Sequence, residues 1–468
     1  MKTIDIRYRR AADGRRGAAL LLAFLVLIVI FAIVYQIKTV TLTESRITYN
    51  EMTRAKMDLA IESVLLQVYE DLAEDARAAS ASEGDQGGPG GSGGGQAPAP
   101  DGGGAQQGDA GEPARNPEAA DSMMDRWYTP QSTNFEDIQI RIFIRDENSK
   151  YNVLNMLNPD EEVAEAALQR VSRILDNARG GTDYDIGGGE AEEMARAMRE
   201  YMVSRFGDDL PRPALLTEDP ENEDQIVPFT FDEFRVLEVF DDRMFEDFFG
   251  ESDERIHSIA SFLTVYTSPA VGSEDAASGM PTGTGGWGVN VNTAPHAVLS
   301  GLFDGRDIGY RLWDEIRDYR NIEEEPLESE EDGLEEEESE PMLDEYGEEI
   351  IQKQIFDGLD ELEEVFEFQT LNETEKQSVQ DLLQVESDVF EIILAARVST
   401  AADAQERLEF ESRREQEEYF RSGEHLVRIV RSVVWRRQAD DDVEIVPLVR
   451  WEVLSNAPLR VLDFPDEE

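Results

Sequence analysis

The sequence predicts an α+β protein organised around one long N-terminal helix, and three observations support this prediction. Residues 18–37 are uncharged and almost entirely apolar, and no Gly or Pro interrupts the chain from there to Glu83. Strand-like runs occur near residues 138–144 and again at 389–398, 426–435 and 443–454. The long stretch between the first run and the others has mostly helical character. We therefore expect a four-stranded antiparallel sheet, interrupted by a large and mostly helical inserted domain.

The composition limits the classes of function that the chain can have. Its 468 residues are enough for two or three domains. They include 102 acidic and 43 basic side chains, and the formal net charge of -59 repels phosphate, so we expect no nucleic acid partner. The chain has no Cys and only three His, which are distant in sequence. We therefore expect neither disulfides nor a thiolate or His-rich metal site.

The N-terminus has the charge pattern of a membrane helix that follows a basic leader. Residues 1–16 carry six Lys and Arg against two Asp. The apolar run of 20 residues that follows can cross the ~30 Å hydrocarbon core of a bilayer. Basic residues cluster before this run, and Lys38 alone follows it directly. By the positive-inside rule, we expect a single-pass membrane protein with a cytoplasmic N-terminus and everything after Lys38 outside.

Three interpretations of this segment remain open. A cleaved secretory signal would end in small residues, whereas this apolar run ends in Val-Tyr-Gln-Ile at 34–37. A plain signal anchor fits the length. The third is a prepilin-type leader, residues 1–17, which a prepilin peptidase cuts between Gly17 and Ala18 on the cytoplasmic side. A small Gly17 directly after two arginines fits this third interpretation.

The helical pattern continues beyond the apolar run. Apolar residues recur at roughly helical spacing from residue 47 to residue 72. We expect a helix of about sixty residues, or ~90 Å. Residues 18–37 are its transmembrane half and residues 38–83 its periplasmic half. A helix with one half in lipid and one apolar face towards a folded domain resembles that of pilins and pseudopilins.

Leu22 departs from the general pilin pattern. It is the fifth residue counted from Ala18, where most pilin-like subunits carry Glu. A carboxylate in lipid needs a partner, which in that family is the N-terminal amine of a neighbouring subunit. A subunit with Leu22 cannot form that pair. The resemblance therefore implies a position with no neighbour beyond it, at the tip of a filament.

Several segments have the composition of loops. Residues 84–121 are rich in Gly and Pro, so we expect a disordered linker. The G-x-S-x-G at 90–94 lacks the strand and helix of a nucleophile elbow, and the G-x-G-x-x-G at 283–288 lacks those of a dinucleotide site. Residues 322–350 carry sixteen Asp and Glu without Lys or Arg, which favours a solvated loop. Because no nucleophile–base pair is recognisable either, we expect no catalytic residues and no enzyme.

The sheet and the inserted domain divide the rest of the chain. Residues 127–148 are the first part of the sheet, 149–386 the inserted domain, and 387–468 the closing strands. Two pairs of similar segments indicate internal repeats within the inserted domain. SKYNVLNMLNP (149–159) is echoed by WGVNVNTAPHAVL (287–299), and FDEFRVLEVF (231–240) is echoed by LDELEEVFEF (359–368).

The Asn-containing repeats allow two interpretations. In the second repeat a short strand is followed by Thr293, a possible helix N-cap, and by Pro295, which fits the first turn of a helix. This unit resembles the helix-hairpin-helix of DNA-uptake receptors, although Asp304 and Asp307 stand where phosphate would bind. We therefore interpret the motif residues as structural residues that bond the backbone. They are Asn152, Asn155, Asn290, Asn292, Thr293 and Pro295.

Together these features resemble general secretion pathway protein K, the large minor pseudopilin of type II secretion. The resemblance rests on the leader with Leu22 and on three motifs: DENSKYNVLNML (146–157), VNVNTAPHAVL (289–299) and VESDVFEIILAARV (385–398). It covers nearly the whole chain. It implies a pilin-like sheet and helix-hairpin-helix-like repeats in the inserted domain, in a member with enlarged loops.

The resemblance implies an assembly role for an inner-membrane protein with the bulk of its chain in the periplasm. A K-type subunit sits at the tip of a short pseudopilus with I- and J-type minor pseudopilins. It primes assembly of the major pseudopilin, which exports folded proteins across the outer membrane. The resemblance also implies methylation of the N-terminus after the peptidase cut and, in some members, bound calcium, for which it assigns no ligands in this chain. The alternative is a membrane-anchored helix-hairpin-helix receptor for DNA binding and uptake.

Overall fold

The computed structural model describes ten stretches of the chain. They are residues 7–83, 120–135, 138–158, 160–206, 229–250, 255–267, 288–320, 355–398, 427–439 and 442–454. Most of the expected linker, both glycine motifs except Gly288, and the acidic run lie outside these stretches. The chain divides into two compact units, residues 1–59 and 60–468.

The first unit is the N-terminal part of helix α1 (Arg7–Glu83). The prediction of one uninterrupted helix is confirmed, and the helix also includes the end of the basic leader, without a break at Gly17. The large apolar side chains from Leu21 to Ile37 are all exposed. Helix α1 is therefore long and apolar enough to cross a membrane, a property that a membrane anchor and a signal sequence share.

The polar residues just beyond the apolar run bond to the helix itself. Thr39, Thr43 and Thr48 each donate the side-chain hydroxyl to the backbone carbonyl four residues earlier, at 2.9 Å. Each hydroxyl thus has its partner within α1. Because Val40 and Leu42 are exposed between them, the apolar surface of this helix extends past Lys38.

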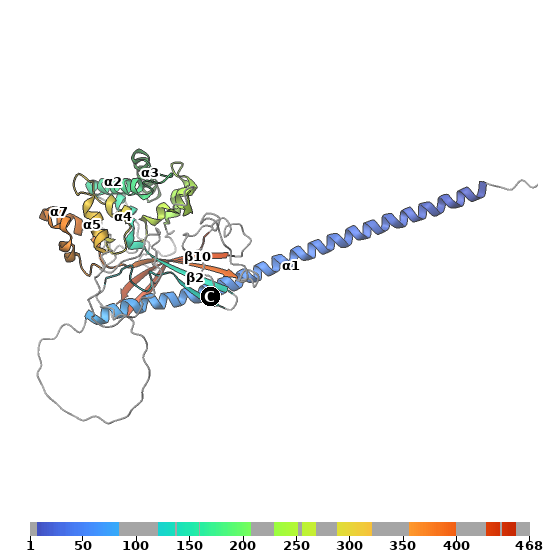
Figure 1. Cartoon of the computed structure of the whole chain (residues 1–468), viewed down its shortest axis with the longest axis horizontal. Helices are drawn as coiled ribbons and strands as arrows, with labels where there is room; N and C mark the ends of the chain where they lie inside the picture. Colours follow the sequence, from blue (N-terminus) through green and yellow to red (C-terminus); the bar gives the residue numbers. More distant parts are fainter. Residues whose placement is uncertain are drawn as a thin grey trace, which may run out of the picture. The chain divides into compact units, whose positions relative to one another are not determined.

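A five-stranded antiparallel sheet forms the centre of the second unit (Figure 1). In spatial order its strands are β1 (Gln131–Phe135), β2 (Ile138–Asp146), β9 (Val389–Val398), β10 (Val427–Ala439) and β11 (Asp442–Val453). The four strand-like runs of the sequence are confirmed as strands, but the prediction of a four-stranded sheet is wrong. The additional strand β1 reads QSTNF, which is short and polar, so no alternation of apolar residues marks it.

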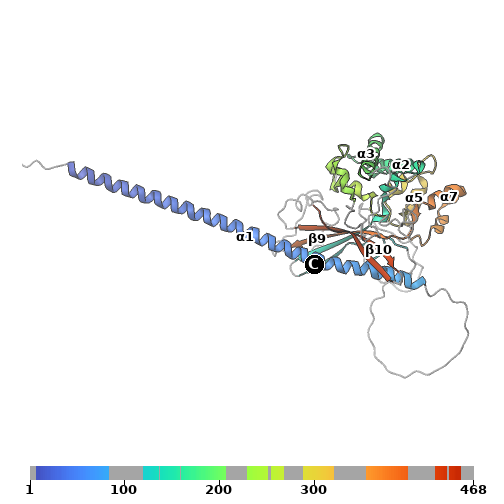
Figure 2. The same ribbon diagram turned by 180° about the vertical axis from the view of Figure 1, so that it is seen from behind.

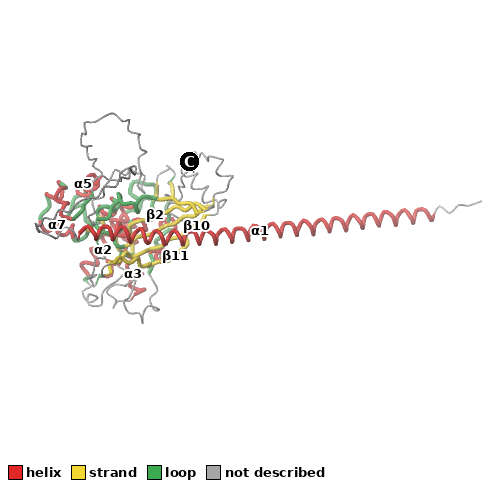
Figure 3. The backbone as a smooth tube through the Cα atoms, turned by 90° about the horizontal axis from the view of Figure 1, so that it is seen from below, coloured by secondary structure: helices red, strands yellow, loops and turns green. Residues whose placement is uncertain are grey.

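The C-terminal part of α1, from residue 60 on, packs on one face of this sheet. The hydroxyl groups of Tyr69 on α1 and Ser432 on β10 are hydrogen-bonded at 2.7 Å. Figure 3 shows α1 crossing the strands. The buried apolar residues of this part recur at helical spacing and are Ala60, Ile61, Val64, Leu65, Val68, Leu72 and Ala73.

The chain between β2 and β9 forms a helical section on the opposite face of the sheet. Successive side chains of a strand point to opposite faces, so Val433 points away from α1 and packs in the core of the helical section. Figures 1 and 2 show α2 to α5 and α7 gathered on this side. The helices are α2 (Glu161–Ala178), α3 (Gly188–Phe206), α4 (His296–Gly301), α5 (Arg311–Arg320), α6 (Phe366–Gln369) and α7 (Glu373–Gln380).

Pairs of two-residue strands connect distant segments of the helical section at the Asn motifs. Strand β3 (Tyr151–Asn152) pairs in parallel with β6 (Leu263–Thr264), and β7 (Val289–Asn290) pairs in parallel with β8 (Leu383–Gln384). A third pair, β4 (Phe248–Phe249) and β5 (Arg255–Ile256), is antiparallel. The strand of each Asn motif thus pairs with a second strand that follows later in the chain.

Short 3₁₀-helices occupy the second pair of similar segments. The segment at 231–240 begins with η4 (Phe231–Val236), and the segment at 359–368 begins with η7 (Leu359–Glu364). The two similar sequences therefore adopt similar local structure. The other 3₁₀-helices are η1 (Glu147–Ser149), η2 (Val153–Leu157), η5 (Asp242–Phe245) and η6 (Ile259–Ser261).

Candidate functional site

The three sequence motifs of the folded unit meet at one buried carboxylate, that of Asp146 at the end of β2. Its Oδ1 accepts the backbone N–H of Asn148 at 2.7 Å. Its Oδ2 accepts hydrogen bonds from the Asn290 amide at 3.3 Å, from the Ser387 hydroxyl at 2.6 Å and from the Thr293 hydroxyl. Asn290, Thr293 and Ser387 are 144, 147 and 241 residues from Asp146 in sequence, so distant segments converge on a single acceptor.

Asp121 joins this cluster from the segment before β1. Its carboxylate accepts the backbone N–H of Ser387 at 2.7 Å and the guanidinium of Arg436 at 2.6 Å. Its backbone carbonyl accepts the Asn290 amide at 3.0 Å. The expected linker therefore ends before Asp121, which belongs to the folded unit. Asp121, Asp146, Asn290, Ser387 and Arg436 are called the Asp146 node.

Three carboxyl groups in and beside the node, those of Asp121, Asp146 and Asp388, have pKa values that burial raises. Burial raises the pKa of Asp146 to about 6, although hydrogen bonds from Ser387 and Thr293 lower it. Burial also raises the pKa of the adjacent Asp388 to about 7, although Arg436 lowers it. Removing an ionised carboxyl from water costs free energy, and the single guanidinium of the node offsets only part of that cost.

A second buried cluster, beside the node, is built from ion pairs. Glu391 on β9 lies directly opposite Arg145 on β2, and their side chains approach to 3.7 Å. Lys150 and Arg431 also reach the Glu391 carboxylate, at 3.6 Å and 3.5 Å, and Lys150 forms a second pair with Glu147. All five side chains belong to buried residues. Arg145, Glu147, Lys150, Glu391 and Arg431 are called the Glu391 network.

The Glu391 network connects the sheet to the helical section. Burial alone would raise the pKa of Glu391, but the three cations around it lower it to about 2. Arg431 continues the network to Glu452 on β11 at 2.7 Å and to Asp232 in the helical section at 3.0 Å. From the helical section, Thr264 donates its hydroxyl to Glu147. These bonds fix the position of the helical section on the strands.

Neither cluster exposes reactive atoms to a substrate. Ser387 lies within hydrogen-bond distance of Asp146, but it is 0 % exposed. Within the ten described stretches, no three His, Asp or Glu side chains are arranged to hold a metal ion. The arrangement can therefore position segments of the chain, and calcium stays an expectation of the family resemblance.

The predicted Asn residues bond backbone groups of the motifs. The Asn152 side chain accepts the N–H of Leu154, and the Asn290 side chain accepts that of Asn292, each at 2.9 Å. The two repeats therefore share one local geometry. Asn292 itself bonds both the N–H and the carbonyl of Phe356, at 2.9 Å and 3.0 Å.

Helix α4 begins at His296, so Pro295 occupies the N-cap position and not the first turn, where the sequence placed it. The prediction of Thr293 as the N-cap is wrong, because its hydroxyl donates to the Asp146 carboxylate instead of accepting an N–H of α4. Asn155, the remaining motif residue, donates its amide to the backbone carbonyl three residues earlier, at 3.0 Å.

The connection between α4 and α5 uses its backbone N–H groups internally. The Asp304 carboxylate accepts the N–H of Arg306 at 2.9 Å, and the Asp304 carbonyl accepts those of Asp307 and Ile308 at 2.9 Å and 3.0 Å. A phosphate-binding turn points such groups at its ligand. This geometry therefore gives no support to the alternative of a DNA receptor.

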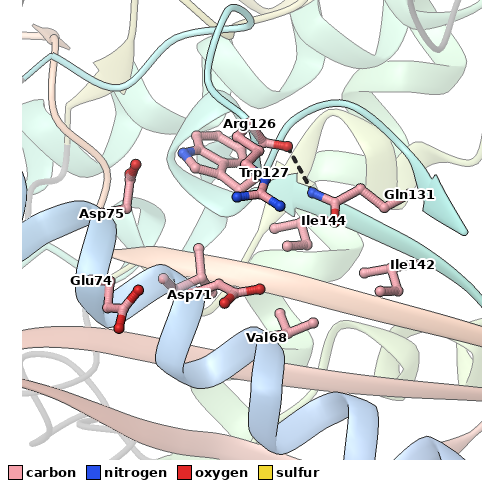
Figure 4. Close-up of a pocket in the computed structure, with 10 residues that line it drawn as sticks. Val68, Asp71, Glu74, Asp75, Arg126, Trp127, Gln131, Ile142 and Ile144 are labelled. Carbon is pink, nitrogen blue, oxygen red and sulfur yellow. Dashed lines mark hydrogen bonds between the residues drawn. The ribbon is translucent and has the colours of Figure 1, made fainter. Parts of the chain in front are cut away.

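An open pocket of about 240 Å³ lies between α1 and the β1 edge of the sheet (Figure 4). Apolar side chains from α1 and β2 line it, together with Trp127, whose ring lies edge-on to Phe390 with the centroids 5.0 Å apart. Gln131 of β1 also lines the pocket and donates its amide to the Arg126 carbonyl at 3.0 Å. The acidic lining residues are Asp71, Glu74 and Asp75, all on α1.

Neither cluster is predicted as a site from the sequence. The signal for the Glu391 network was present, because Arg145, Glu391 and Arg431 interrupt otherwise apolar strands. A charge inside such a strand indicates a buried partner. No comparable signal marks Asp121, which follows directly on a Gly- and Pro-rich stretch.

The residues predicted at the N-terminus belong to the first unit. Gly17 and Ala18 lie within the helical backbone of α1. Leu22 is 67 % exposed, in the middle of the exposed apolar side chains. Cleavage between Gly17 and Ala18 stays a prediction.

No protein-family model and no curated protein matches the chain. Among solved structures, the chain is similar to one from the GspK-GspI-GspJ complex of the type 2 secretion system of enterotoxigenic Escherichia coli. The TM-score is 0.35 at 13 % sequence identity, and the match covers 71 % of this chain and 86 % of that chain. A TM-score of this size establishes no common fold, so the likeness by itself assigns no function to this chain.

Proposed function

We propose that the chain is a minor pseudopilin, anchored in the inner membrane, that sits at the tip of a type II secretion pseudopilus and primes its assembly. The observation that carries the proposal is α1, a single helix whose large apolar side chains from Leu21 to Ile37 are all exposed. Its C-terminal part, from residue 60 on, packs on an antiparallel sheet. The basic leader that ends at Gly17 and the three motifs of the folded unit support the same role.

Each part of the chain then has a task. The apolar run holds the subunit in the membrane until assembly. Leu22 places it at the tip, because it offers no carboxylate to a further subunit. The Asp146 node and the Glu391 network keep the helical section and the sheet in one arrangement, which an assembly subunit needs in order to present fixed surfaces to I- and J-type minor pseudopilins and to the major pseudopilin.

Processing of the N-terminus tests the proposal directly. The full chain is produced in a bacterial host with and without a prepilin peptidase, and its N-terminus is determined by mass spectrometry. We expect loss of residues 1–17 and methylation of Ala18 only when the peptidase is present. Gly17→Val should block the cut, because a branched side chain replaces the small residue before the scissile bond. Gly14→Val, in the same leader, is the matched control and should still be cut.

A full-length product would contradict the proposal if the same cells process their own pseudopilins. The second step is co-purification of the processed chain, in detergent, with I- and J-type subunits. We expect one stable complex of the three chains. Leu22→Glu should not prevent this complex, but should let the subunit enter positions below the tip, which cross-linking between neighbouring N-terminal helices would detect.

A further inference from the structure

The two edge strands of the sheet are built differently. β11 carries the features that prevent further strands from pairing: Glu444, Arg450 and Glu452 are charged, and Pro447 cannot donate to a ladder. β1, with the sequence QSTNF, has no charge and no Pro. Among the described residues, no strand pairs with its outer edge. The backbone of β1 is therefore ready to accept another strand, and β11 is not.

The open pocket lies directly beside this unprotected edge. Gln131 belongs both to β1 and to the pocket lining. It lies opposite Ile142 in the antiparallel ladder, so its side chain shares the face of the sheet that α1 covers. A strand added to β1 would place every second side chain on this face, about 5 Å from that of Gln131 and next to the acidic residues of α1.

The pocket has the chemistry to hold a long basic side chain. Val68, Leu72 and Ile144 give it apolar walls, along which the methylene groups of Lys or Arg can lie. Arg126 also lines the pocket (Figure 4), so the lining carries one cation against the three carboxylates of Asp71, Glu74 and Asp75. Asp71 and Glu74 are exposed, and in the described part of the chain neither forms an ion pair with Arg126 or with another cation. They can therefore receive the charged end of such a side chain at the opening.

We propose that β1 and this pocket together form a docking surface for an extended segment of another protein. The segment adds a strand to the sheet at β1 and places a Lys or Arg side chain in the pocket. A second copy of this chain is a poor occupant, because two chains of net charge -59 repel each other. The proposal does not depend on the pseudopilin role, since β1 and the pocket both belong to the folded unit.

The test uses the full chain in detergent and a synthetic peptide as the probe. The peptide is a capped strand of alternating threonine and valine with one central arginine, and a matched peptide carries glutamate instead. We expect the arginine peptide to bind at least about tenfold more tightly at low salt, and salt to weaken its binding. Hydrogen exchange should slow at the backbone amides of residues 131–135 when this peptide is bound.

Variants separate the pocket from the strand edge. Asp71→Asn with Glu74→Gln should weaken binding of the arginine peptide about tenfold, whereas Glu62→Gln with Glu70→Gln removes the same charge from α1 outside the pocket and should have little effect. Ser132→Pro and Thr133→Pro test the edge, because successive N–H groups of a strand point to opposite sides. At one of these two positions the N–H points towards β2, and proline there should lower the melting temperature. At the other position the N–H points to the outer edge, and proline there should leave the melting temperature unchanged but abolish peptide binding.

Three results would overturn the proposal. The first is equal binding of the arginine and glutamate peptides. The second is peptide binding that leaves exchange at residues 131–135 unchanged, which would place the peptide elsewhere. The third is protection of these amides that grows with protein concentration in the absence of peptide, which would identify a second copy as the occupant. Since none of these measurements involves the leader, failure here would not affect the cleavage test at Gly17.

Discussion

The Asp146 node and the Glu391 network are neighbours in sequence and in space, and yet the pKa values of their buried carboxyl groups are shifted in opposite directions. Arg145 and Asp146 are successive residues of β2, so their side chains leave the strand in opposite directions. The pKa of Asp146 is raised to about 6, and that of Glu391 is lowered to about 2. The difference comes from the partners, because neutral hydroxyl and amide groups surround Asp146, whereas three cations surround Glu391.

The two clusters therefore make opposite contributions to stability as the pH changes. The pKa of Glu391 is below its ordinary value of 4.5, so this residue stabilises the fold above pH 4.5, and the contribution is lost as the pH falls towards 2. The pKa values of Asp146 and Asp388 are above their ordinary value of 3.8. Their contribution is greatest below pH 3.8 and is lost as the pH rises through about 6 and 7.

The largest expected effect comes from removing the charge of the Glu391 network. Glu391→Gln leaves Arg145, Lys150 and Arg431 buried with too few anions. We expect it to lower the free energy of unfolding by about 3–5 kcal/mol at pH 7, measured by chemical denaturation. The matched control is Glu444→Gln, which breaks an exposed pair with Arg437 and should cost less than about 1 kcal/mol.

The same pair of variants tests the pH dependence of the network. The contribution of the Glu391 charge is lost as the pH falls from 4.5 towards 2, so the difference in stability between wild type and Glu391→Gln should shrink over this range. A difference that stays constant from pH 7 to pH 2 would mean that packing, rather than charge, gives this cluster its effect.

A smaller effect is expected from the node, where neutral hydrogen bonds dominate. Asn290→Ala removes the amide that bonds Asp121, Asp146 and Ser387, together with the acceptor for the N–H of Asn292. Because buried polar groups then lose their partners, we expect a loss of about 2–3 kcal/mol in the free energy of unfolding.

Asn155→Ala is the control for this prediction. Asn155 belongs to the same kind of motif but makes one bond, to a backbone carbonyl at 3.0 Å, and is only half-buried. We expect a loss below about 1 kcal/mol. Equal losses in the free energy of unfolding for the two variants would show that the hydrogen bonds of Asn290 within the node stabilise the fold no more than the single bond of Asn155.

The comparison of the two clusters also shows how far the sequence determines the structure. Period and length were sufficient for α1 and for β2, β9, β10 and β11, because these elements carry long apolar runs or apolar residues at regular spacing in the sequence. They were insufficient for β1, because its sequence has four polar residues and one Phe without a strand pattern, and only its pairing with β2 makes it a strand. Local propensity also failed at Thr293, where a distant carboxylate competes for the hydroxyl.

The clusters could be foreseen only in part, since their members are distant in sequence. Charges inside apolar strands indicate that Glu391 and Arg431 have buried partners, but not which ones. The sign of a pKa shift depends on the number of cations that the fold brings to each carboxyl group. That number is a property of tertiary structure, and no spacing within one strand encodes it.

The smallest expected effect, and the one of opposite sign, comes from Asp388 beside the node. Asp388→Asn keeps the shape of the side chain and removes its carboxyl group. Burial raises the pKa of this carboxyl group to about 7, although Arg436 lowers it. Arg436 keeps its pairs with Asp121 at 2.6 Å and Asp75 at 3.7 Å. We therefore expect the variant to be more stable than wild type by about 1–2 kcal/mol at pH 8, and equally stable below pH 4, where both side chains are neutral.

Thermal denaturation at pH 4, 6 and 8 measures this difference. The control is Asp381→Asn, because Asp381 is an exposed Asp that also precedes β9, and its melting temperature should change little at any of these pH values. If Asp388→Asn instead lowers the melting temperature at pH 8, its ionised carboxylate stabilises the node through Arg436. The node would then be an ion-pair cluster like the Glu391 network. The two clusters would differ in their number of charges, but the stability that they contribute would change with pH in the same direction.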